Sequence, residues 1–139
     1  MSGETGPIRQ TRLVFTAPLR LAGGLNAREH WRKRAKRVGT ERNATTFAAL
    51  AALGRDWQRA VSFPCVVTIT RRGPRLLDDD NLPGSCKAVR DQIAAELGIT
   101  DGPTDKRASW AYAQERGAYG VTVEIACEDA LRGLGQTPK

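Results

Sequence analysis

Segments rich in β-branched and aromatic residues predict four strands. Residues 12–16 (RLVFT) and 63–70 (FPCVVTIT) have this composition, and the continuous apolar run of the second is typical of a strand buried inside a sheet. Residues 107–114 and 119–127 predict two further strands, joined by the turn ERGAYG. The last strand alternates, so that one of its faces carries Val121, Val123, Ile125 and Cys127.

Apolar residues spaced three and four positions apart predict two helices. The first runs from about His30 to Leu53, with Gly39 weakening or kinking its middle and Gly54 ending it. Its apolar face consists of Trp31, Ala35, Val38 and the segment TTFAALAAL. The second helix covers about residues 81–97 and is closed by Gly98. Its core-facing stripe consists of Leu82, Cys86, Val89, Ile93 and Leu97.

The elements follow one another in the order β-α-β-α-β-β, which predicts a small α+β fold. We expect a single domain over residues 12–128, in which a mixed sheet packs with two helices. Residues 1–11 and 129–139 are expected to be flexible ends, because they lack apolar periodicity.

Composition places the chain among ordinary globular proteins. It has 139 residues, of which 40% are hydrophobic and 27% charged. No apolar run approaches the roughly 20 residues that cross a bilayer, and MSGETGPIRQTR lacks the apolar core of a signal peptide. We therefore expect a cytoplasmic protein with no membrane partner. The three cysteines are widely spaced without a C-x-x-C pair, which favours buried free thiols.

Net charge favours a polyanionic partner. The formal net charge is +7 and the isoelectric point is near 9.9, so nucleic acid is the leading candidate. Basic residues concentrate in a stretch that holds only Glu29 and Glu41 as acids. They are Arg28, Arg32, Lys33, Arg34, Lys36, Arg37 and Arg42. A solvated helix face is the alternative to phosphate binding.

An acidic segment, RLLDDDN, interrupts this basic chain. In an extended backbone Asp78 and Asp80 lie on one face and Asp79 on the other. Two carboxylates directed at one point suit a hard divalent cation such as Mg²⁺. An EF-hand is excluded because residues 82–83 are Leu and Pro, where that motif needs an oxygen ligand and glycine. A nucleotide-sugar enzyme would need a larger, doubly wound fold.

Further charged residues follow the acidic segment. Asp80, Lys87 and Asp91 fall at helical spacing on the face opposite the core stripe. A surface ion pair between Lys87 and Asp91 is the alternative explanation for these two residues. The loop GITDGPTDKR adds Asp101 and Asp105, which form an ordinary turn unless the sheet brings them beside Asp80.

The pattern LLDDDNL…KAVRDQIAAELGITDGPTD resembles the RusA family of Holliday junction resolvases, which is common in phages and prophages. The family signature is D-x-D-N-L at a helix start, then a lysine and an aspartate on the same helix, and acidic residues before the next strand. LNAREHWRKRAKR is similar to the stretch that opens the first helix of phage-borne members. The resemblance covers about residues 12–127 and implies a RusA-like fold.

The resemblance also implies roles for individual residues. Asp78 and Asp80 match the carboxylates that hold Mg²⁺, with Mn²⁺ as an alternative metal. Lys87 matches the catalytic lysine, which neutralises charge on the scissile phosphate. Asp105 matches the third essential aspartate, and Asp101 competes for that role as a metal ligand. The residues expected to bind DNA are Arg28, Arg32, Lys33, Arg34, Lys36, Arg37, Arg71, Arg72 and Arg75.

The implied activity is metal-dependent cleavage of four-way DNA junctions by a C₂ homodimer in the cytoplasm of a bacterial host, encoded by a phage or prophage. The metal would activate a water for in-line attack on a phosphodiester, without a covalent intermediate. On this view His30 is a structural or DNA-contacting residue. Two alternatives remain: a non-enzymatic, basic nucleic-acid-binding protein, and an interaction module with a structural metal.

Overall fold

A computed structural model describes residues 11–21, 29–100 and 102–127. Over these residues the α+β class and the predicted succession of strands and helices are found, with a short 3-10 helix added after the first helix and the second predicted helix present as two helices. Thr11, which we expected in the flexible N-terminal segment, is the first residue of the first strand. The elements are β2 (Thr11–Ala17), α1 (Trp31–Leu53), η1 (Trp57–Ala60), β3 (Cys65–Gly73), α2 (Leu82–Ser85), α3 (Lys87–Leu97), β4 (Ala108–Arg116) and β5 (Gly120–Cys127).

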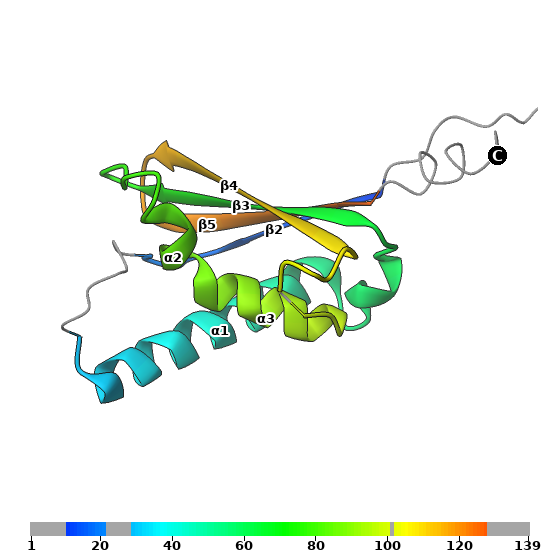
Figure 1. The fold of residues 1–139 in the computed structure, drawn as a ribbon, viewed down its shortest axis with the longest axis horizontal. Coiled ribbons are helices and arrows are strands. Elements are labelled where there is room, and N and C mark those ends of the chain that lie inside the picture. Colours follow the sequence, from blue (N-terminus) through cyan, green and yellow to red (C-terminus); the bar gives the residue numbers. More distant parts are fainter. Residues whose placement is uncertain (1–10, 22–28, 101, 128–139) are drawn as a thin grey trace, which may run out of the picture.

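The four strands form one mixed sheet in the order β2-β5-β3-β4. β3 and β4 are parallel, whereas β5 is antiparallel to both of its neighbours. The helices α1 and α3 lie on the same face of this sheet (Figure 1). The register aligns Ala17 with Val121, and Val121 with Arg71. The end of β2, the start of β5 and the end of β3 therefore lie next to one another at one end of the strands, which we call the Gly73 end of the sheet.

The core lies between the sheet and the helices. The residues that β5 contributes to it were predictable from the sequence. The four alternating residues of β5 are all buried, as the period of two requires. The stripe of the second predicted helix is buried from Leu82 to Ile93, and Leu97 is partly buried against it. The predicted position of residues 63–70 inside the sheet is also confirmed, since β3 has a neighbour on each side.

The apolar face predicted for α1 is wrong in its first half. Trp31 is 68% exposed, and so is Phe47 near the other end. The residues that α1 buries are Glu41, Thr45 and Ala49. Small and polar side chains line the side of α1 that faces the protein, so hydrophobicity alone points to the wrong face of this helix.

The first helix has the predicted extent, since α1 is helical from Trp31 to Leu53 and includes Gly39. The second differs from expectation in its continuity. The second predicted helix is divided into α2 and α3 at Cys86, whose φ and ψ of −94° and 2° are not helical. The residues before α2 form a turn at positions 79–81 rather than an extended segment.

The cysteines behave as the composition suggested. Cys65, Cys86 and Cys127 are buried free thiols, and burial raises the pKa of Cys86 to about 11. Thiols of this kind pack as small hydrophobic groups and are poorly reactive at neutral pH. Within the described ranges, no helix combines the length and the apolarity needed to cross a membrane.

Candidate metal and nucleic-acid site

The acidic loop, residues 74–81, leaves the Gly73 end of the sheet and leads into α2. It is tied to β4 through Leu77, whose N–H donates to Gln114 Oε1 at 2.9 Å and whose carbonyl accepts from Gln114 Nε2 at 2.7 Å. The carbonyl of Asp78 then accepts from the N–H groups of Asn81 and Leu82, at 2.9 and 3.2 Å. Hydrogen bonds to the backbone of Leu77 and Asp78 therefore hold the loop next to its carboxylates.

The carboxylates of Asp78, Asp79 and Asp80 are exposed. Within residues 11–21, 29–100 and 102–127, the side-chain oxygens of these three residues accept no hydrogen bond and form no ion pair. The extended geometry predicted for them is wrong, because Asp79 and Asp80 lie in a turn. The side chains of Asp78, Asp79 and Asp80 therefore do not alternate between two faces of a strand, and only the family resemblance distinguishes the three residues.

Three adjacent negative charges repel one another unless a cation lies between them. Carboxylate oxygens free of protein donors fit Mg²⁺, which proteins bind through one or two carboxylates while several waters stay on the metal. No group of three or more His, Cys, Asp or Glu side chains is gathered in the described part of the chain. The residues of the acidic loop thus fit a partly hydrated cation rather than an enclosed metal cage.

Asp105 does not join the acidic loop. It follows α3 and precedes β4, whose first residue Ala108 pairs with Cys65 at the start of β3. The acidic loop instead follows the end of β3 and precedes α3. The 11 residues of α3, a length of roughly 16 Å, therefore separate the two sites. The predicted grouping of Asp78, Asp80 and Asp105 is not present in this structure.

The Asp105 carboxylate is occupied by neighbouring donors. Arg107 donates from Nη2 at 2.7 Å and from Nε at 3.0 Å, and its backbone N–H donates at 3.0 Å. The N–H and hydroxyl of Thr100 donate at 3.1 Å each. These hydrogen bonds, led by that from the Arg107 side chain, hold the pKa of Asp105 well below its usual range. Asp105 therefore braces the loop between α3 and β4.

We expect Asp105→Asn to lower the melting temperature at neutral pH, because the amide cannot accept the same set of charged hydrogen bonds. The folded pKa lies below the unfolded pKa of about 3.9, so this stabilisation is present above that pH and declines as the pH falls further. Melting curves from pH 2.5 to pH 7 would check this, and the difference between wild type and variant should shrink below about pH 4. Lost metal-dependent activity at an unchanged melting temperature would instead favour a metal ligand.

Lys87 stands at the start of α3 and is 69% exposed. Its Nζ lies 3.2 Å from Asp91 Oδ2, which is the ion pair that we considered as the alternative explanation for these residues. Exposed pairs of this spacing contribute a few tenths of a kcal/mol, so the lysine is held only weakly. Asp101 and Arg28, two further predicted site residues, lie outside the described residues.

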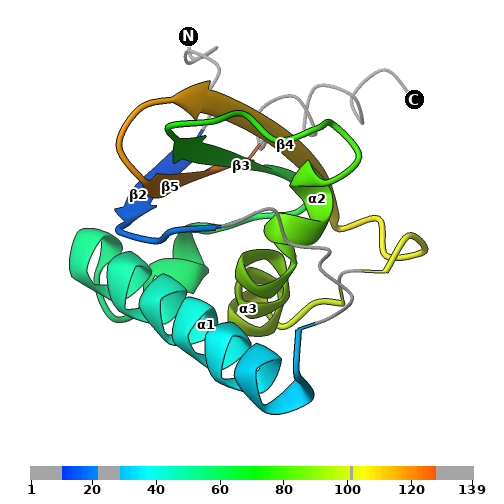
Figure 2. The same ribbon diagram turned by 90° about the vertical axis from the view of Figure 1, so that its left-hand side faces the viewer.

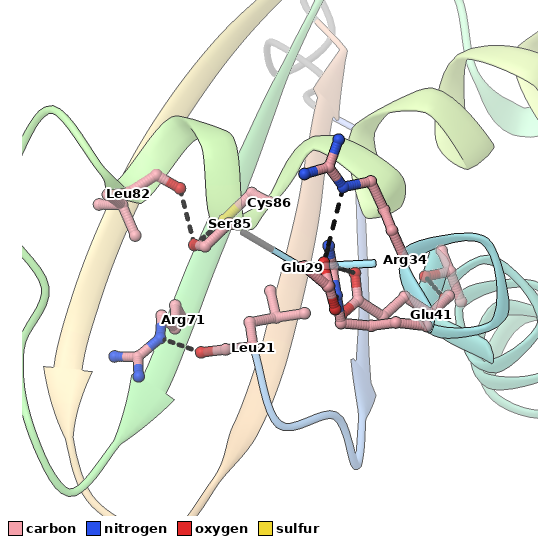
Figure 3. Close-up of polar contacts among 10 residues, drawn as sticks. Leu21, Glu29, Arg34, Glu41, Arg71, Leu82, Ser85 and Cys86 are labelled. Carbon is pink, nitrogen blue, oxygen red and sulfur yellow. Dashed lines mark hydrogen bonds and ion pairs between the residues drawn. The ribbon is translucent and has the colours of Figure 1, made fainter. Parts of the chain in front are cut away.

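Arg71 is not available for DNA, which corrects the prediction from sequence. It is 3% exposed, and its Nε donates to the carbonyl of Leu21 at 2.6 Å (Figure 3). Its Nη1 donates to the carbonyl of Arg75 at 2.9 Å. Arg71 therefore joins the chain that follows β2 to the first part of the acidic loop. Strand periodicity contained this signal, since Arg71 shares the buried face of β3 with Val67 and Ile69.

Arg72 and Arg75 differ from Arg71 in their surroundings. Arg72 lies on the opposite face of β3, where its Nε is 3.1 Å from Glu115 Oε1 and its Nη2 donates to the Thr122 hydroxyl at 2.9 Å. The side chain of Arg75 is exposed at the start of the acidic loop. Of the three arginines predicted to bind DNA from this segment, Arg75 has the accessibility that phosphate contact requires.

The basic residues of α1 divide into paired and exposed groups. Arg37 donates to both carboxylate oxygens of Glu29, at 2.9 and 3.0 Å, and Arg34 Nε lies 3.6 Å from the same carboxylate. Figure 3 shows Glu29 and Arg34 next to the buried Glu41. The side chains exposed without an acidic partner in the described ranges are Arg32, Lys33 and Lys36.

His30 has a structural role at the beginning of α1. Its Nδ1 accepts a hydrogen bond from the N–H of Arg32 at 3.1 Å, which caps the helix. Such a bond satisfies one of the N–H groups that have no partner in the first helical turn. The structural part of our expectation for His30 is confirmed.

The acidic loop and the exposed cations lie at the same end of the molecule. Figure 2 faces this end, where α2, the end of β2 and the first turns of α1 surround the Gly73 end of the sheet. A scan against protein-family models finds no match to the chain, and a search of curated proteins finds no significant relative.

Proposed function

We propose that this protein is a Mg²⁺-dependent endonuclease that cleaves four-way DNA junctions. The observation that carries the proposal is the set of exposed carboxylates in the acidic loop, which have no partner in the described ranges although the chain has a net charge of +7. Three carboxylates without a basic partner among the described residues can take a cation of another kind. The RusA-like sequence pattern supplies the class of reaction.

In this proposal Asp78 and Asp80 would hold the metal. Mg²⁺, when bound, supplies water activation and charge neutralisation at a phosphodiester. Lys87 can turn from Asp91 toward a DNA phosphate, because its ion pair is exposed and weak. The cations of α1 at the same end retain the polyanion through phosphate contacts.

A homodimer is part of the proposal, because a four-way junction has near two-fold symmetry and two strands must be cut. A C₂ dimer with one acidic loop in each subunit meets that requirement. A non-enzymatic DNA-binding protein is the second candidate, and the exposed lysines of α1 favour binding in either case.

The deciding experiment compares a labelled four-way junction with a linear duplex of matched sequence. Wild-type protein is incubated with each substrate in Mg²⁺, in Mn²⁺ and in EDTA. We expect paired nicks in the junction, much less cleavage of the duplex, and no cleavage in EDTA. Junction binding without cleavage in both metals would reject the nuclease and leave the binding protein.

A further inference from the structure

A cleft of about 490 Å³ opens between residues 18–20 and the first three turns of α1. We call it the basic cleft. Its charged lining consists of Arg20, Glu29, Lys33, Lys36, Arg37 and Glu41. Arg20 was not among the residues that the sequence suggested for DNA binding, because it lies apart from the basic stretch of α1. The fold brings it to the other wall of the same cleft.

The acids of the basic cleft are neutralised from within the protein. Glu29 receives two hydrogen bonds from Arg37, which lower the pKa of this carboxyl. Glu41 is 4% exposed, and desolvation raises its pKa in spite of Arg37 Nη1 at 3.3 Å. Arg37 thus donates hydrogen bonds to both Glu29 and Glu41. The remaining cations of the cleft, on Arg20, Lys33 and Lys36, are exposed and form no ion pair with a described acid.

Tyr119 extends the basic cleft toward the turn between β4 and β5. The guanidinium carbon of Arg20 lies 4.8 Å from the centroid of the Tyr119 ring, and Tyr119 is 40% exposed. This contact follows from the sheet, since Ala17 pairs with Val121 and both residues are near the Gly73 end. A partly exposed aromatic ring beside a cation is the surface on which single nucleic-acid strands stack their bases.

The basic cleft is connected to the acidic loop through Arg71. Leu21, whose carbonyl receives the Arg71 Nε at 2.6 Å, follows Arg20 directly in the chain. The other end of the Arg71 guanidinium holds the carbonyl of Arg75, three residues before Asp78. One buried side chain thus fixes the wall of the cleft relative to the loop that carries the carboxylates.

We propose that the basic cleft binds the phosphodiester backbone of one DNA strand through Arg20, Lys33 and Lys36, with Tyr119 contacting a base or sugar at its edge. The choice of DNA as the polyanion rests on the proposed function, whereas the binding itself does not require cleavage. Each lysine or arginine that neutralises a phosphate adds about 0.9 to the slope of log K against log salt concentration. We therefore predict a salt dependence of DNA binding that can be measured without the metal.

The test uses fluorescence anisotropy with a labelled four-way junction, in EDTA so that no cleavage occurs. We expect Lys33→Gln with Lys36→Gln to weaken binding about tenfold near 0.1 M salt and to reduce the salt slope by about 1.8. Arg20→Gln should reduce the slope by about 0.9. Tyr119→Ala should weaken binding without changing the slope, because the ring carries no charge.

The matched control is Arg55→Gln with Arg59→Gln, which removes the same charge from two exposed residues beyond the other end of α1. We expect the salt slope of this variant to differ from that of wild type by less than about 0.45, which is half the contribution of one phosphate contact. If the two double variants lost affinity and salt slope equally, the proposal would be overturned, and DNA would be attracted by the overall positive charge and not by the cleft. Wild-type slopes in both double variants would also overturn it. A protein that binds in this way but never cuts DNA would contradict the proposed nuclease and leave the cleft assignment standing.

Discussion

Asp80→Asn is expected to reduce Mg²⁺-dependent junction cleavage by about 100-fold or more and to leave junction binding at least as tight as in wild type. The substitution keeps the size of the side chain but removes a negative charge that would hold the metal in the proposed site, and loss of electrostatic stabilisation in an active site typically costs a factor of roughly 100 to 1,000. The loss of one negative charge also lowers repulsion of the DNA backbone. Single-turnover cleavage and anisotropy in EDTA measure the two effects separately.

The acidic loop offers a matched control for this prediction. Asp79→Asn removes the same charge from an adjacent, equally exposed carboxylate. According to the resemblance, Asp79 is not a ligand, so we expect less than about a threefold loss of activity, the effect of a general change in surface potential. Equal losses in the two variants would show that the charge of the loop matters and that no particular carboxylate holds the metal. Full activity in Asp80→Asn would contradict the assignment of the metal site.

Arg71→Met is expected to lower the free energy of unfolding by about 3 kcal/mol. Methionine replaces the aliphatic stem of the arginine but donates no hydrogen bond. The carbonyls of Leu21 and Arg75 would therefore lose their charged donors. Hydrogen bonds to charged groups contribute roughly 1.5 to 3 kcal/mol each, and a buried acceptor left without a donor carries an added cost. Urea unfolding at neutral pH measures the loss.

Arg72→Met is the control for this prediction, because it makes the same substitution at the next position of β3. Arg72 is partly exposed, and its partner Glu115 is 60% exposed, so we expect a loss below about 1 kcal/mol. A loss at Arg72 as large as that at Arg71 would contradict the role we give to burial. Arg71→Met should also reduce junction cleavage in protein that remains folded, since the acidic loop loses its connection to Leu21.

The local spacing of hydrophobic residues was sufficient to predict most of the secondary structure. Period two along β5 predicted four buried residues, and a spacing of three and four predicted the buried stripe that ends in α3. The same patterns failed for α1, where the buried residues are Glu41, Thr45 and Ala49. Glu41 is buried because Arg37, one helical turn earlier, donates to it. A hydrophobicity pattern cannot predict the burial of a charged residue that is stabilised by a hydrogen-bonded partner of opposite charge.

For the candidate site, the order of residues along the chain defines which chemical groups are present, whereas the packing of strands and helices defines which of these groups meet. RLLDDDN identifies a cluster of carboxylates whatever the fold. The separation of Asp105 from this cluster depends on the direction of α3 and on the parallel pairing of β3 with β4. The meeting of Arg20 with Lys33 and Lys36 depends on where β2 ends relative to α1. Contacts between distant positions arise from packing, and short-range spacing carries no information about them.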